Sequence, residues 1–99
     1  MKYELGKDLK NNLKKITKYS KDLEYYEKYL KFCELEMKDI NLTVHAHRVN
    51  DKISVFNLEF FERLQVEREK QIENVKKKIE TIKEKIDQCE DILEEKIHT

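Results

Sequence analysis

Apolar residues recur at alternating steps of three and four through most of this sequence. In the first half the repeat comprises Leu5, Leu9, Ile16, Tyr19, Leu23, Tyr26, Leu30, Cys33, Met37, Ile40 and Val44. In the second half it comprises Leu58, Phe61, Ile72, Val75, Ile79, Ile82, Ile86, Cys89 and Leu93. Residues three and four apart share one face of an α-helix, and this repeat is the a/d seam of a coiled coil. The sequence therefore predicts an all-α fold of two helices, each with one narrow apolar seam.

A polar segment between the two repeats marks the predicted reversal of the chain. His47 and Arg48 supply cations suited to a helix C-terminus, Asn50 adopts the left-handed conformation readily, and Asp51 is a suitable N-cap for the next helix. We therefore predict a single domain built as a long antiparallel helical hairpin, a coiled coil. Its predicted parts are helix 3–48, turn 49–52 and helix 53–97 within residues 1–99.

Charge supports the same alignment of the two helices. Facing residues should have numbers that sum to about 101 or 102, because both helices rise equally per residue. This register places Lys10 opposite Asp91 and Lys14 opposite Asp87. Exposed ion pairs contribute only about 0–1 kcal/mol each, so we expect them to select the register more than they stabilise the fold.

An alternative for the tip is a short β-hairpin. Segments 42–47 and 53–56 are rich in strand-forming residues and flank Asn50 and Asp51. The resulting order of helix, β-hairpin and helix resembles that of β-type prefoldin subunits. This resemblance implies a chaperone subunit that joins other chains through its strands and holds unfolded clients between helical arms. That family usually has a Gly in its hairpin, whereas the one glycine here is Gly6.

Composition limits the class of partner. With 42% charged residues, one Gly and no Pro, the chain suits helices whose outer faces meet water. Its 21 basic and 21 acidic residues cancel, so no net field draws it to nucleic acid, and binding through the run 76–78 is a minor alternative. No apolar run approaches the roughly 20 residues that span a bilayer, and the first residues lack the apolar stretch of a secretory signal. We expect a cytoplasmic protein that binds no membrane.

Residues with catalytic or metal-binding chemistry are few and scattered. His45 and His47 would share a face only in a strand, and no other ligand pair stands near them to close a four-ligand zinc site. Cys33 and Cys89 occupy seam positions, where we expect small buried hydrophobic residues in a reducing compartment. A single Gly6 excludes a glycine-rich phosphate-binding loop. We predict no enzymatic activity, no cofactor and no metal.

Polar residues interrupt the seam at three positions, Asn12, Gln65 and Arg68. Polar residues at such positions fix register or oligomeric state while they lower stability. They are also able to face a partner.

A second set of apolar side chains lies off the seam. Six of them are the predicted partner-binding residues Tyr25, Tyr29, Phe32, Phe56, Phe60 and Leu64, and Leu35, Leu42 and Val66 extend the set. Exposed apolar patches mark contact sites, and aromatic residues anchor interfaces. The alternative is that these side chains are partly buried along the hairpin's own flank.

Energetics favour a protein partner. Ordering the chain costs on the order of 150 kcal/mol of conformational entropy, and a two-helix seam buries little apolar surface against it. We therefore expect the off-seam apolar residues to bind a partner. The partner is either a second copy, which would give a dimer that forms a four-helix bundle, or another protein.

The expected function is that of a protein–protein interaction module: an adaptor, a complex subunit, or a small regulator that inhibits a target by covering it. Abundant Lys, Ile, Asn and Tyr are compatible with an AT-rich genome such as that of many phages. A phage-encoded inhibitor is therefore one form that this module can take.

Overall fold

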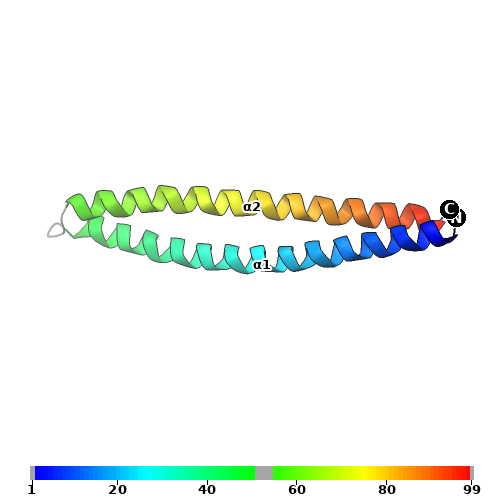
Figure 1. Ribbon diagram of the computed structural model, residues 1–99. Helices are drawn as coiled ribbons and strands as arrows, with labels where there is room; N and C mark the ends of the chain where they lie inside the picture. The colour runs from blue at the N-terminus through cyan, green and yellow to red at the C-terminus, as the bar shows by residue number, and fades with distance from the viewer. Residues whose placement is uncertain (1, 51–54, 99) are drawn as a thin grey trace. The chain divides into compact units, whose positions relative to one another are not determined.

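Two α-helices make up the computed structural model, which describes residues 2–50 and 55–98 (Figure 1). Helix α1 spans Lys2–Val49 and helix α2 spans Val55–His98. Side chains are described for residues 6–50 and 57–95. No strand occurs among the described residues, so the predicted all-α class is confirmed.

The helices contact each other in two compact units. The terminal unit combines Met1–Glu27 with Lys77–Thr99, and the turn unit comprises Lys28–Lys76. In Figure 1 the blue start of α1 lies beside the red end of α2, and the green ends of both helices belong to the turn unit.

Both units pair their helices antiparallel. In the terminal unit, Tyr19 contacts Lys85 and Tyr26 contacts Lys78, so numbers fall along α2 as they rise along α1. The turn unit has the same order, with contacts that join Tyr29 to Gln71, Glu36 to Arg68, Asn41 to Gln65 and Arg48 to Glu62. The predicted helical hairpin is therefore confirmed as the local arrangement in each unit.

The predicted seam forms the core of each unit. Cys33 and Val44 are 1% exposed and are the most deeply buried side chains described. The other buried apolar residues are Met37, Ile40 and Val75 in the turn unit and Ile79, Ile82 and Cys89 in the terminal unit. Every remaining seam residue is partly buried, except Leu5, whose side chain lies outside the described residues. Narrow seams of this kind bury only one stripe of each helix.

The tip is helical where the sequence suggested a first strand. Segment 42–47 forms the last turns of α1, and the backbone amide of Asn50 donates to the carbonyl of Ala46 at 3.2 Å. Burial of Val44 in the seam outweighs the strand preference of its neighbours, because propensity yields to packing. Of the second suggested strand, residues 55–56 lie in α2 and residues 53–54 lie outside the described ranges.

The described helix boundaries differ slightly from the predicted ones. Helix α1 ends at Val49 and α2 begins at Val55, whereas the sequence pattern predicted a second helix from residue 53. The predicted N-cap, Asp51, lies outside the described residues.

We predict that Ile79→Asp unfolds the helix pair. The side chain of Ile79 is 7% exposed in the seam, so a carboxylate there loses its hydration without gaining a partner, at a cost of at least about 3 kcal/mol. Urea denaturation followed by circular dichroism measures the free energy of unfolding. The control is Ile92→Asp on the same helix, where a side chain 41% exposed predicts a change of only about 0.5 kcal/mol. Equal losses in the two variants would contradict the assigned seam.

Candidate protein-interaction surface

Several large apolar side chains in the turn unit face solvent. On α1 these are Phe32, Leu35, Leu42 and Val49, which are 56% to 70% exposed. On α2 they are Phe60 and Val66. Single exposed apolar residues are normal on protein surfaces, so these residues indicate a contact surface only if they lie together on one face.

The four residues on α1 lie on one face of the helix. Successive members are three, seven and seven residues apart, which is the spacing of a heptad seam. At about 100° of rotation per residue, Leu35 and Leu42 point roughly opposite to the buried α1 seam. We call Phe32, Leu35, Leu42 and Val49 the outer stripe. In the turn unit, helix α1 thus has two heptad faces, and α2 covers only one of them.

Polar residues give the outer stripe a distinctive charge pattern. The two heptad positions that it skips are filled by Asp39 and Ala46, so one carboxylate lies in its middle. Lys31, Lys38 and His45 come directly before residues 32, 39 and 46 of this repeat, and all three are exposed. This edge of the outer stripe therefore has two lysines and one histidine.

The structure separates the six residues predicted to bind a partner. Tyr25 belongs to the terminal unit, is exposed, and packs its ring edge-on against Tyr26 at 5.3 Å between centroids. In the turn unit Phe32 and Phe60 are exposed, whereas Tyr29 and Leu64 are partly buried. The side chain of Phe56 lies outside the described residues.

Sequence reasoning missed the grouping of the outer stripe. Leu35 and Leu42 were assigned to an extension of the aromatic set, and Val49 was placed in the turn. The steps of three, seven and seven were the available signal, because they match a heptad that is offset from the main seam. This second repeat is hard to recognise in the sequence, because the outer-stripe residues alternate along the chain with residues of the main seam.

Tyr29 belongs to a polar network across the seam instead of a free surface. The Gln71 amide donates to the Tyr29 hydroxyl, and Arg68 Nη1 donates to Gln71 Oε1 at 2.7 Å. Arg68 Nη2 also pairs with Glu36 Oε2 at 3.0 Å. Partial burial and the neighbouring Cys33 thiol raise the pKa of the Tyr29 phenol, against the opposing effects of Gln71 and Arg68. The hydroxyl is therefore held protonated as one member of an internal polar layer.

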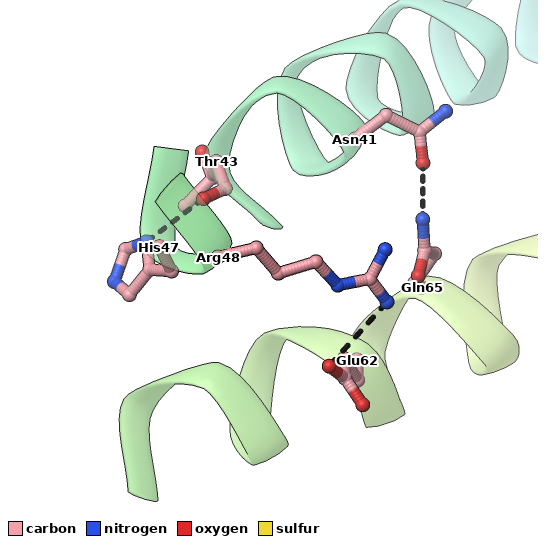
Figure 2. A network of polar contacts seen from close by, with 6 residues as sticks. All are labelled: Asn41, Thr43, His47, Arg48, Glu62 and Gln65. Carbon is pink, nitrogen blue, oxygen red and sulfur yellow. Dashed lines mark hydrogen bonds and ion pairs between the residues drawn. The ribbon is translucent and has the colours of Figure 1, made fainter. Parts of the chain in front are cut away.

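A second polar layer lies nearer the end of α1 (Figure 2). Gln65 Nε2 donates to Asn41 Oδ1 at 2.6 Å, and Arg48 pairs with Glu62 at 3.4 Å. Gln65 and Arg68, which the sequence identified as polar seam positions, thus each bond to a residue of α1. These bonds are satisfied only in one alignment of the helices, so they fix the register of the turn unit.

His47 contributes to the same end of the unit. Its Nδ1 lies 2.8 Å from the carbonyl oxygen of Thr43, as Figure 2 shows, and its ring packs at 5.0 Å from the ring of Phe61. The imidazole therefore has packing and hydrogen-bond roles within the helix pair.

The terminal unit has a groove of about 350 Å³ with three lysines along it. The lining includes Asp22, Lys77 and Thr81. Lys78 Nζ lies 5.4 Å from the centroid of the Tyr26 ring, and Lys85 Nζ lies 5.7 Å from that of Tyr19. Such exposed cation–π contacts contribute about 0.5–1 kcal/mol each. Lysines of α2 therefore help to join the two helices here.

The two lysine–carboxylate pairs that the sequence predicted for this unit are not formed. Among the residues whose side chains the structure describes, no ion pair links Lys10 to Asp91 or Lys14 to Asp87. Exposed charges gain little from a fixed geometry, which explains why such pairs need not form.

Other chemistry is sparse in the described ranges. Cys33 and Cys89 are buried free thiols. No group of three or more His, Cys, Asp or Glu side chains within residues 2–50 and 55–98 is placed to hold a metal ion. Neither helix, in its described part, contains an apolar stretch long enough to cross a bilayer.

Comparison of the chain with protein-family models, curated proteins and solved structures finds no match.

We predict that Arg68→Ala lowers the free energy of unfolding by about 1–2 kcal/mol, because it leaves Glu36 and Gln71 without their partly buried partner. The control is Arg48→Ala, which removes the more exposed and longer pair with Glu62 and should cost only about 0–0.5 kcal/mol. Chemical denaturation of the two variants makes the comparison. If both variants lose the same free energy of unfolding, the layer that contains Arg68 contributes no more to stability than the exposed pair of Arg48.

Proposed function

We propose that the protein is a non-enzymatic protein–protein interaction module and that its outer stripe binds an α-helix of the partner. The observation that supports this function is the exposure of Phe32, Leu35, Leu42 and Val49 in heptad spacing on the uncovered face of α1. Exposed apolar side chains that gather on one face of a helix mark contact sites.

The spacing argues for a helical partner. Side chains at steps of three and four, or seven, insert as knobs into holes formed by residues of a facing helix. An extended partner would instead match a repeat of two. The outer stripe has the first repeat and lacks the second.

Energetics set the requirement on that partner. Full burial of a large apolar side chain contributes roughly 1.5–3 kcal/mol, whereas association costs about 4–15 kcal/mol. Four such residues contribute a free energy that lies within the range of that cost, so on their own they leave little net affinity. The partner must therefore contribute its own apolar stripe.

An adaptor, a subunit of a complex and an inhibitor that covers its target all use this mode of binding. An inhibitor encoded by a phage belongs to the same class. Each acts by occupying a surface, so the outer stripe is the functional element in every case.

Photo-cross-linking in producing cells tests this function. A benzoylphenylalanine at position 32, on the outer stripe, should give covalent protein adducts. The matched control is position 13, because Leu13 and Phe32 lie on the same helix and are equally exposed, at 56%. Adducts that form equally at both positions, or none at position 32, would contradict the proposed surface.

A further inference from the structure

The groove of the terminal unit collects positive charge. It is lined by Lys77, Lys78 and Lys85 of α2, and Asp22 of α1 contributes one carboxylate. We call this site the lysine groove. Among the described side chains, no ion pair joins any of these four residues to an opposite charge. The lysine groove therefore has an excess of two positive charges.

The sequence keeps other carboxylates away from two of these lysines. Lys78 and Lys85 are seven residues apart and share one flank of α2. No Asp or Glu lies three or four residues from either of them. The flank on the other side of the seam differs, because Lys83 has Glu80 and Asp87 at those distances. Positive charge is thus left without neighbouring carboxylates only on the flank that borders the groove.

Aromatic rings of α1 position the same two ammonium groups. Lys78 Nζ lies 5.4 Å from the centroid of the Tyr26 ring, and Lys85 Nζ lies 5.7 Å from that of Tyr19. A cation–π contact orients an ammonium group without cancelling its charge. Both charges are therefore held beside the groove and remain available to an anion.

The inner wall of the lysine groove is apolar. Ile82 is 8% exposed, and the Tyr26 ring is half-buried. The volume of about 350 Å³ lies at the lower end of the range of roughly 300–1,000 Å³ for ligand pockets. A small organic group can therefore pack against this wall while an anionic group meets the lysines.

We infer that the lysine groove binds a small phosphate monoester. Such a group carries about −1.5 to −2 charges at pH 7, which matches the excess of two positive charges, and lysine ammonium groups donate to its oxygens. A carboxylate or a sulfate ester has a single charge and matches less well. This site goes beyond the proposed function, because it lies in the terminal unit whereas the outer stripe lies in the turn unit.

Titration of the isotope-labelled full chain with phenyl phosphate, followed by heteronuclear NMR at constant ionic strength, tests the inference. Amide signals of residues 77–85 should shift and saturate. Phenyl sulfate has the same ring and less charge, so it should bind about fivefold more weakly. Absence of saturable shifts in this segment, or equal binding of the sulfate, would overturn the phosphate monoester as ligand.

Asp22→Asn should strengthen binding. Removal of this carboxylate should lower the dissociation constant for phenyl phosphate about fivefold, which is the effect of one unit charge near contact distance in water. Damage to the fold would not tighten binding, so this result separates charge from structure. Unchanged or weaker binding would contradict the inference.

Lys85→Gln should raise the same dissociation constant about fivefold. The matched control is Lys83→Gln, an equal change of charge at an exposed site on the other flank of α2. It should leave the constant within about twofold, because salt screens charges outside the groove. Circular dichroism checks that both variants keep their helices. Equal weakening by the two variants would show that phosphate responds only to the overall charge of the chain, and this would overturn the site.

Discussion

The seam between α1 and α2 is the interaction on which the rest of this structure depends. Each helix buries a single stripe, and Cys33 and Val44 are the most deeply buried residues described. Neither helix would hold its conformation alone with so many charged residues, because tertiary packing supplies most helical stability in water. Once the seam is covered, the opposite face of α1 in the turn unit is held in place with its exposed apolar residues, and on this face we propose that another helix binds.

Two polar layers define how that seam aligns. Arg68 with Glu36, and Gln65 with Asn41, form bonds that a shifted register would break. An apolar heptad repeat alone is compatible with neighbouring registers, since each shift by seven residues again matches apolar with apolar. The polar layers thus trade some stability for a defined alignment. That alignment determines which residues of α1 stay uncovered, including Leu35 and Leu42.

Periodicity and polar interruptions in the sequence predicted the helical class, the seam and its polar positions. These predictions held because the residues that repeat at steps of three and four are the ones that the two helices bury against each other. The segment 42–47 shows where propensity failed, since burial of Val44 outweighs its strand preference. Spacing alone does not reveal that the Tyr29 hydroxyl accepts a hydrogen bond from Gln71 across the seam. Val49 was overlooked as a helical surface residue because its neighbours are typical of turns.

The central claim is that the polar layers align the two helices of the turn unit in one register. Spin labels at positions 41 and 65 of one chain test it most directly, because Gln65 Nε2 donates to Asn41 Oδ1 across the seam at 2.6 Å. Pulsed electron paramagnetic resonance should give an intramolecular distance below about 25 Å, from the 8–10 Å spacing of packed helices plus the label arms. A longer distance between the two labels would contradict the account.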